Sequence, residues 1–379
     1  MARGADVRNT HVSTVKTATR HATRERVFLF MGNVNAIEVG ILGATGVVGQ
    51  QFVSRLARHP WFRCTWLAAS ERSEGKTYKS VAPWRLNTPI PGAAADRVVQ
   101  ACVPGRGPKV VFSGLDASVA GDIEGAFAKA GHIVVTNARN FRMDPVVPLL
   151  IPEINADHLA LIGEQRRVKC WNGAIVTNPN CSTVVLAMAL APLRQFNVRS
   201  VIVSTMQAVS GAGYPGVPSL DILGNVVPFI GGEEEKMQTE TLKILGSDGG
   251  RKPYPAAVSA HTNRVAVLDG HTMTVSVGFE EKPPIDAVAE AMRNFSGKPQ
   301  ELWLPSAPHP PIVVAEQQDR PQPRLDSDLG GGMSVSVGRV RECPVMHAKF
   351  VALGHNTVRG AAGAAILNAE LMHAEGMLS

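Results

Sequence analysis

One cysteine of this chain stands where a helix is predicted to begin. Cys181 lies in the string NPNCST (178–183), directly before the apolar run 184–190. The free backbone N–H groups and the positive dipole end of a helix N-terminus favour a thiolate over a thiol, so this cysteine is a candidate nucleophile. Most free cysteines are small buried hydrophobic residues, and the position alone leaves both interpretations open.

A glycine-rich turn lies nearer the start of the chain. The string GATGVVG (43–49) follows a short apolar run at 36–42 and precedes a helical pattern of apolar residues at 47–57. In such a turn the glycines let the backbone approach a pyrophosphate, whose charge the helix N–H groups receive. The string therefore predicts dinucleotide binding, and a turn that is glycine-rich for backbone reasons only is the alternative. The expected contacts are Gly43, Thr45, Gly46, Val47 and Val48.

The end of the next predicted strand, 62–69, bears on the choice of cofactor. Enzymes that select NAD usually place an acidic residue there to bind the ribose 2′-hydroxyl. Here Ser70, Arg72 and Ser73 follow the strand and could bind a 2′-phosphate through charge-assisted hydrogen bonds. NADP is therefore predicted, although Glu71 keeps NAD open and Arg72 could be a solvated loop residue.

Strands and helices alternate along the first half of the chain. After the glycine turn, strand patterns at 62–69, 109–113 and 132–136 accompany a helical pattern at 121–130. This alternation is typical of a parallel, doubly wound sheet. We therefore expect a Rossmann-like dinucleotide-binding domain over 36–178, completed by a buried C-terminal helix within 355–379.

The pattern changes after Cys181. Alternating runs there are typical of antiparallel strands with one solvated face, and they follow one helix, one long strand and a loop dense in glycine and proline. We therefore expect an α+β catalytic and dimerisation domain over 179–354, which makes the fold class α/β with two domains. The helix is predicted at 183–195 and the strands at 200–207, 256–267, 271–279 and 333–340.

The composition is that of an ordinary globular protein, with 379 residues of which 45% are hydrophobic and 18% are charged. Five widely spaced cysteines without a CxxC pair indicate neither a disulfide framework nor a zinc site, and no metal is predicted. No apolar run approaches the roughly 20 residues that a membrane span needs. The net charge of +6 arises mainly at 1–30, which has six basic and two acidic residues, so no nucleic-acid-binding face is predicted elsewhere.

The basic segment at the start has three interpretations. It is rich in Ser and Thr and poor in acidic residues, as organelle transit peptides are. Met31 lies just before the first predicted strand, so 1–30 could also be a mis-assigned start or a disordered extension. We expect a disordered extension over 1–35 and a cytoplasmic protein, with organelle targeting as the less favoured alternative.

Four strings carry a resemblance to a known family. They are NPNCST (178–183), SGAGYPGVPSLDI (210–222), GGEEEK (231–236) and HNTVRGAAG (355–363). From about residue 37 to its end, the chain closely resembles aspartate-β-semialdehyde dehydrogenase in its archaeal and fungal-like branch. The resemblance implies an oxidoreductase of amino-acid biosynthesis that converts 4-aspartyl phosphate and NADPH to aspartate 4-semialdehyde, NADP and phosphate, on the route to lysine, threonine, methionine and isoleucine.

The resemblance also implies a role for each residue of the reaction site. Cys181 would form the thioacyl enzyme and His271 would be its general acid/base, since histidine has an ordinary pKa of about 6.5. Asn180 and the backbone N–H of Cys181 would stabilise the oxyanion. Gln207 would orient the substrate or the histidine. Without the resemblance, a lone histidine in a strand is more often structural.

The substrate groups find implied partners in the same way. Arg264 would bind the α-carboxylate through a bidentate fork, and Glu240 would bind the α-ammonium group. Arg142 and Lys243 would bind the phosphate. Spacing alone puts Glu240 and Lys243 on one helical face with Glu233, where a solvated ladder of salt bridges is the alternative.

The resemblance adds three cofactor contacts, Ser210, Gly211 and Asn356, of which Asn356 would meet the nicotinamide. It also implies a homodimer or homotetramer, and residues 210–232 and 305–332 are the candidate interface. Two other functions stay open. One is an acyl-CoA reductase, such as a malonyl-CoA reductase, that would release CoA in place of phosphate. The other is a catalytically silent NADP-sensing regulator on the same fold.

Overall fold

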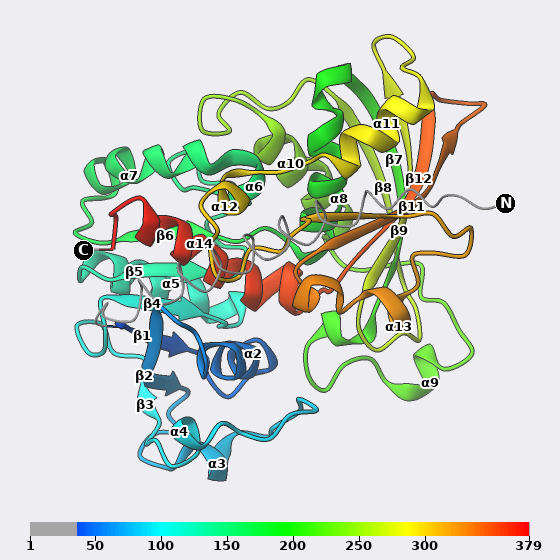
Figure 1. Ribbon diagram of the computed structural model, residues 1–379. Helices are drawn as coiled ribbons and strands as arrows, with labels where there is room; N and C mark the ends of the chain where they lie inside the picture. Colours follow the sequence, from blue (N-terminus) through cyan, green and yellow to red (C-terminus); the bar gives the residue numbers. More distant parts are fainter. Residues whose placement is uncertain (1–35, 379) are drawn as a thin grey trace, which may run out of the picture. The chain divides into compact units, whose positions relative to one another are not determined.

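The computed structural model describes residues 36–378, so the expectations for 1–35 lie outside the described residues. Its first sheet has six strands in the order β3-β2-β1-β4-β5-β6, all paired in parallel (Figure 1). This is the doubly wound order of a dinucleotide-binding fold, and the predicted fold class is confirmed. The strands are β1 (Ile37–Leu42), β2 (Phe62–Ala69), β3 (Gln100–Ala101), β4 (Val110–Ser113), β5 (Ile133–Thr136) and β6 (Ala174–Thr177).

Helices connect these strands, as a parallel sheet requires. The predicted helix after the glycine turn is present with almost the same bounds, and the one predicted at 121–130 begins four residues earlier, where the Asp116 carboxylate accepts from the Ser118 N–H at the N-cap. The helices are α2 (Val47–Leu56), α3 (Tyr78–Val81), α4 (Gly92–Ala95), α5 (Ala117–Lys129), α6 (Pro152–Asn155) and α7 (Leu161–Lys169).

The second sheet also has six strands, in the order β10-β11-β12-β9-β7-β8. Its centre is antiparallel, but β8 pairs in parallel with β7, and β10 pairs in parallel with β11. The prediction of antiparallel pairing is therefore wrong for β8, because the long connection through α10 (Glu233–Leu245) lets β8 run parallel to β7. The strands β10 and β12 were not predicted from the sequence. The strands are β7 (Val198–Gln207), β8 (Ala257–Arg264), β9 (His271–Phe279), β10 (Ile312–Ala315), β11 (Val335–Glu342) and β12 (Ala348–Gly354).

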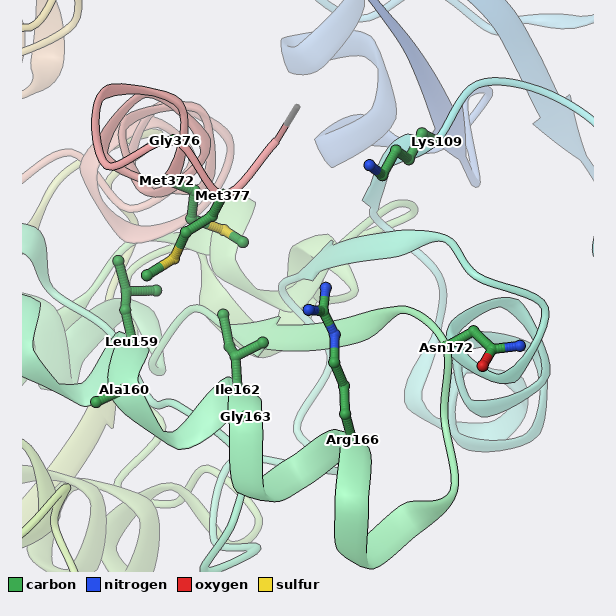
Figure 2. Close-up of a pocket in the computed structure, with 10 residues that line it drawn as sticks. All are labelled: Lys109, Leu159, Ala160, Ile162, Gly163, Arg166, Asn172, Met372, Gly376 and Met377. Carbon is green, nitrogen blue, oxygen red and sulfur yellow. The ribbon is translucent and has the colours of Figure 1, made fainter.

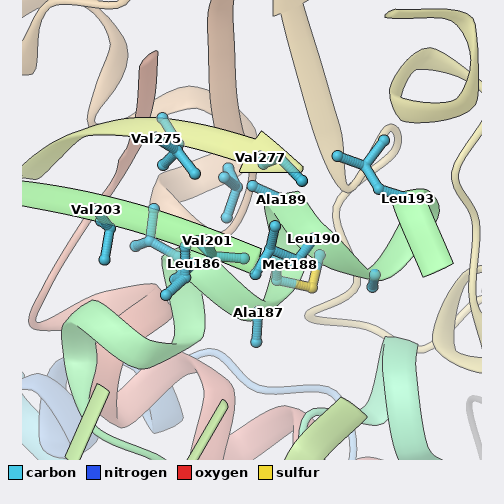
Figure 3. Packing of buried hydrophobic residues seen from close by; sticks show 14 of the residues in the cluster. Leu186, Ala187, Met188, Ala189, Leu190, Leu193, Val201, Val203, Val275 and Val277 are labelled. Atoms are coloured by element: carbon cyan, nitrogen blue, oxygen red, sulfur yellow. The ribbon is translucent and has the colours of Figure 1, made fainter. Parts of the chain in front are cut away.

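The helix α8 (Cys181–Leu190) runs through the core beside this sheet. Every residue after Cys181 in it is buried, and Figure 3 shows its side chains close to valines of β7 and β9. The predicted helix 183–195 is corrected at its end, because 3-10 geometry begins at Ala191 and Pro192 cannot donate to an α-helical ladder. A helix buried on all sides fixes the position of the cysteine at its first residue.

The C-terminal segment joins the two halves of the fold. It begins with a π-helical turn, η5 (Val358–Ala362), and continues as α14 (Gly363–Ala374). The turn contacts α8 and α2, and α14 contacts α2 and β5. The domain boundaries at 178 and 354 remain a prediction. Within residues 36–378 no helix is long and apolar enough to cross a membrane.

Candidate active site

The cysteine and the histidine of the predicted reaction site lie together. Cys181 is the first residue of α8 and is half-buried, and His271 is the first residue of β9 and is buried. The Cys181 Sγ and the His271 Nε2 are 3.2 Å apart. A hydrogen bond between a thiol and an imidazole is the arrangement that activates cysteine nucleophiles.

The protonation of His271 is set by a contact on its other nitrogen. The backbone N–H of Ala208 donates to the His271 Nδ1 over 3.1 Å, so this nitrogen carries no hydrogen and the neutral ring carries its hydrogen on Nε2. Burial, with the positive charges of Arg264 and His355, lowers the pKa of His271 to about 3. In this arrangement Nε2 donates to the sulfur and cannot remove its proton, so the predicted proton exchange requires another protonation state.

The charge around the sulfur is mixed. Burial and, to a lesser extent, the Glu233 carboxylate raise the pKa of the Cys181 thiol, whereas the guanidinium groups of Arg142 and Arg264 lower it, and the pKa that results is about 12. The ligand-free site therefore favours the thiol. The two arginines are the side chains whose charge stabilises the thiolate.

Arg264 reaches the site from the end of β8. Arg264 lies opposite Gln207 in the pairing of β8 with β7, and its Nη1 donates to the Ala208 carbonyl over 2.7 Å. A Cβ atom on Gly211 would lie 2.9 Å from both this nitrogen and the His271 Cε1. Gly211 is therefore needed as glycine where the loop passes the histidine and the arginine, and this packing was not part of its predicted role.

Arg142 and Glu240 are paired with each other. The Arg142 Nη1 donates to the Glu240 Oε1 over 3.0 Å, and the other carboxylate oxygen accepts from the backbone N–H of Asn180 over 2.7 Å. Both side chains are buried. The Arg142 Nε is buried without a partner, which leaves a donor for an anionic ligand.

Lys243 is not directed at the sulfur. Its ammonium group donates to three backbone carbonyls, those of Arg142, Asp144 and Val147, over 2.8 to 3.1 Å. An ammonium group has three hydrogens, and all three are used here. In this structure Lys243 thus holds the loop that carries Arg142, which differs from the predicted direct contact with phosphate.

Asn356 and Ser210 are hydrogen-bonded to each other next to His271. The Asn356 Oδ1 accepts from the Gly270 N–H over 2.9 Å, and its Nδ2 donates to the Ser210 hydroxyl over 2.7 Å. One amide hydrogen of Asn356 remains for a ligand. Gln207 is buried nearby, but its side chain donates to Thr205 at 3.4 Å, and the orientation of His271 comes from the next residue, Ala208.

The glycine turn fits a pyrophosphate. Gly43 has a φ of +74°, and a Cβ atom on Gly49 would lie 2.2 Å from the Gly43 carbonyl oxygen, so both positions require glycine. No side chain caps the N-terminus of α2, which leaves the N–H groups of Val47 and Val48 for a ligand. At the end of β2, Ser70 and Arg72 are exposed and Ser73 is buried.

Three contacts at the site were not predicted from sequence: those of Ala208, Glu233 and Gly360. A Cβ atom on Gly360, in η5, would lie 2.6 Å from the Cys181 Cβ. Glu233 accepts from the Asn180 side chain. The sequence places Glu233 only on a charged helical face, and the residue types of Ala208 and Gly360 give no indication of a role at the site.

A separate cavity of about 560 Å³ is lined by residues of α7 and of the C-terminal segment, with the basic side chains of Lys109 and Arg166 (Figure 2). None of the predicted site residues lines it. It is therefore distinct from the site around Cys181.

In the described part of the chain, no cluster of His, Cys, Asp or Glu is suited to holding a metal ion.

The fold and the family models together define a dehydrogenase with a nicotinamide-binding domain. Residues 38–162 match the model described as semialdehyde dehydrogenase, NAD binding domain, and 190–359 match the semialdehyde dehydrogenase dimerisation domain. The aspartate-semialdehyde dehydrogenase of Methanothermobacter thermautotrophicus is 52% identical over 89% of this chain and 99% of its own. That of Cryptococcus neoformans is 49% identical over 90% of this chain and 98% of its own.

A solved structure agrees with these relatives. The aspartate-semialdehyde dehydrogenase of Candida albicans, crystallised with NADP, superposes with a TM-score of 0.83 at 43% identity, over 90% of this chain and all of that one. The chain belongs to the aspartate-semialdehyde dehydrogenase family, as its sequence motifs predicted, and is an oxidoreductase.

Proposed function

We propose that this chain catalyses the NADPH-dependent reductive dephosphorylation of L-4-aspartyl phosphate to L-aspartate 4-semialdehyde through a thioester on Cys181. The observation that carries the assignment is the 3.2 Å contact between the Cys181 Sγ and the His271 Nε2 at the start of a buried helix. A nucleophile, a hydrogen-bond donor and two cations meet there, as acyl transfer from a phosphate requires.

Cys181 performs the covalent steps. The Cys181 thiol first loses its proton to solvent, and Arg142 and Arg264 stabilise the thiolate. The thiolate attacks the acyl carbon, the carbon–sulfur bond forms, and the carbon–oxygen bond to phosphate breaks with its electron pair going to phosphate. A bound NADPH supplies the hydride that reduces the thioester carbon. The aldehyde is released when the carbon–sulfur bond breaks and its electron pair returns to sulfur. The Nε2–H of His271 and the backbone N–H of Cys181 stabilise negative charge on sulfur and oxygen in turn.

Each charged side chain binds or supports a different group of the substrate. Arg264 binds the α-carboxylate, and Arg142, with its unpartnered Nε, binds the phosphate. Glu240 provides negative charge for the α-ammonium group while it holds Arg142 in place. Lys243 supports the phosphate site through the loop that it ties down.

NADP is the cofactor supported by the exposed Arg72 and Ser70 after β2 and by the buried Ser73. The uncapped start of α2 and the glycine turn bind its pyrophosphate. The other proposed cofactor contacts, Ser210, Gly211 and Asn356, lie near His271.

A homodimer or homotetramer is supported by the dimerisation domain and by exposed apolar side chains within 210–232, notably Leu220 and Phe229. The cytoplasmic location stays a prediction.

The assay that tests this function is phosphate-dependent reduction of NADP by the purified protein with aspartate semialdehyde, compared with malonate semialdehyde plus CoA. We expect turnover only with the first pair. Cys181→Ala should abolish it while NADPH still binds. Unchanged turnover in that variant would overturn the mechanism, and preference for the second pair would indicate an acyl-CoA reductase.

A further inference from the structure

Asn180, the residue before the nucleophile, is held at nearly every polar atom. Its Oδ1 accepts from the N–H groups of Ser182 and Thr183 over 2.9 and 3.2 Å, as an N-cap does. Its backbone N–H donates to the Glu240 Oε2 over 2.7 Å, and its Nδ2 donates to the Glu233 Oε1 over 2.8 Å. The start of the cysteine helix is therefore fixed from outside as well as by its own cap.

The two carboxylates come from one face of α10. Glu233 and Glu240 are seven residues apart, which is about two helical turns, and both are buried. A buried carboxylate requires hydrogen-bond donors, and each of these finds one on Asn180. The second oxygen of Glu233 accepts from the Lys236 ammonium over 3.2 Å.

The contact with Glu233 decides how the amide of Asn180 faces the helix. A carboxylate only accepts hydrogen bonds, so it keeps the NH2 end of the amide toward itself and the oxygen toward the helix N–H groups. A flipped amide would set its NH2 against the N–H groups of Ser182 and Thr183. With Oδ1 committed to those two residues, the N–H of Cys181 has no acceptor within residues 36–378 and is left for the substrate oxygen.

We propose that Glu233 is a positioning residue for the nucleophile, which it serves by holding the amide of Asn180 in the orientation that caps α8 and leaves the Cys181 N–H free. The inference rests on the proposed role of Cys181. It assigns to Glu233 a function separate from substrate binding by Glu240.

Glu233 has two opposing effects on the nucleophile. Its hydrogen bond with Asn180 positions the nucleophile, whereas its negative charge disfavours the thiolate. Its carboxylate raises the pKa of the Cys181 thiol, so the charge by itself disfavours the thiolate. A neutral side chain that still offers an acceptor oxygen should keep the orientation and lose this effect. A side chain of similar size without an acceptor should lose the orientation.

Glu233→Gln and Glu233→Met separate the two effects. We expect Glu233→Gln to retain kcat within about 3-fold of the wild type, and Glu233→Met to lose at least about 10-fold in kcat with KM for aspartate semialdehyde changed less than about 3-fold. In Glu233→Gln the pH midpoint for alkylation of Cys181 by iodoacetamide, followed by mass spectrometry, should move to lower pH. Glu235→Gln, an exposed position on the same turn, is the matched control and should change none of these quantities.

A double-mutant cycle tests the route through Asn180. Because Glu233 acts on Asn180, Glu233→Met should add less than about 2-fold to the loss caused by Asn180→Ala. Independent, multiplying losses would overturn the proposal. So would a Glu233→Met enzyme with wild-type kcat, even with a lowered melting temperature.

Folding and the assigned nucleophile are checked separately. NADPH binding and thermal unfolding report whether each variant is folded, and Glu233→Ala replaces Glu233→Met if that variant does not fold. Failure of both to fold would overturn the proposal, because the fold rather than the site would then require Glu233. An active Cys181→Ala enzyme would instead defeat the proposed function on which the inference rests.

Discussion

The backbone N–H of Ala208 donates to the Nδ1 of His271, and this contact determines which ring nitrogen faces the sulfur with a hydrogen. Ala208 follows β7 directly and His271 begins β9, the strand that pairs with β7. The pairing of the two strands therefore sets the tautomer of the histidine. No side chain is needed for this orientation, because the donor belongs to the main chain.

The first prediction concerns this tautomer. In the ligand-free protein His271 should be the neutral Nε2–H form from neutral pH down to about pH 5, since burial lowers its pKa to about 3. Nitrogen-15 NMR of histidine-labelled protein distinguishes the two tautomers and the charged ring, and the His271→Asn variant assigns the signal. A hydrogen found on Nδ1, or a ring that becomes charged near pH 6.5, would contradict the observed contact.

Gly360 leads to the second prediction. A Cβ atom there would lie 2.6 Å from the Cβ and 2.9 Å from the Cα of Cys181. The turn cannot easily move away, because Arg359 beside it forms a fully buried bidentate pair with Glu153 over 2.7 and 2.8 Å. Gly360→Ala should therefore displace the nucleophile and lower kcat by roughly 100-fold, since misplacement by about 1 Å has effects of this size.

Steady-state kinetics and NADPH binding check this expectation. Gly125→Ala is the control, because a Cβ atom at this position in α5 has no neighbour closer than 3.8 Å, and it should leave kcat unchanged. A Gly360→Ala enzyme with wild-type kcat would show that the cysteine tolerates the shift.

The first sheet could be predicted largely from the sequence because its signals are local. The glycine turn between an apolar run and a helical pattern defines β1 and α2 within twenty residues. The strands β3, β6, β10 and β12 and the parallel pairing of β8 were missed. An edge strand with one solvated face has the same alternation whether its neighbour runs parallel or antiparallel.

The site was predictable where residue types carry the chemistry. The structure brings four such residues together around one sulfur atom. His271 forms a hydrogen bond with the Cys181 Sγ, and the charges of Arg142 and Arg264 act on it. The contacts of Ala208, Gly360 and Glu233 could not be predicted in this way. Ala208 acts through its backbone N–H, Gly360 leaves space because it has no side chain, and the sequence does not show which group a carboxylate oxygen of Glu233 accepts from. Lys243 shows the converse, because its type suits phosphate while the structure uses its donors on carbonyls.

Arg72 carries the third prediction, which concerns the choice of cofactor. Its side chain is exposed in the turn after β2, where a guanidinium group could bind a 2′-phosphate. Arg72→Ala should weaken NADPH binding by roughly 10-fold or more, as expected for loss of a charge-assisted hydrogen bond, and should change NADH binding less than about 2-fold. Titration with both nucleotides measures this. Arg58→Ala, at an exposed position after α2, should affect neither, and equal losses for both nucleotides in Arg72→Ala would remove Arg72 from the 2′-phosphate site.

The last prediction concerns stability in acid. His158 is fully buried, and burial, with the nearby Lys243 ammonium, lowers its pKa to about 4, while Asp157 acts in the opposite direction. The unfolded chain takes up a proton on this histidine near pH 6.5, whereas the folded protein does so only near pH 4. The free energy of unfolding should therefore fall as the pH drops from 6.5 to 4, by on the order of 2 to 3 kcal/mol from this group.

Urea unfolding at several pH values measures this loss, and its slope with pH is the quantity to compare. His158→Gln should be less stable than the wild type at pH 7, but it should lose less stability between pH 6.5 and 4, because position 158 no longer titrates. Some acid dependence should remain, since the depressed pKa of His271 acts with the same sign. His261→Gln, at an exposed position, should keep the wild-type slope, and a wild-type slope in His158→Gln would show that His158 is already charged or solvated in the folded protein.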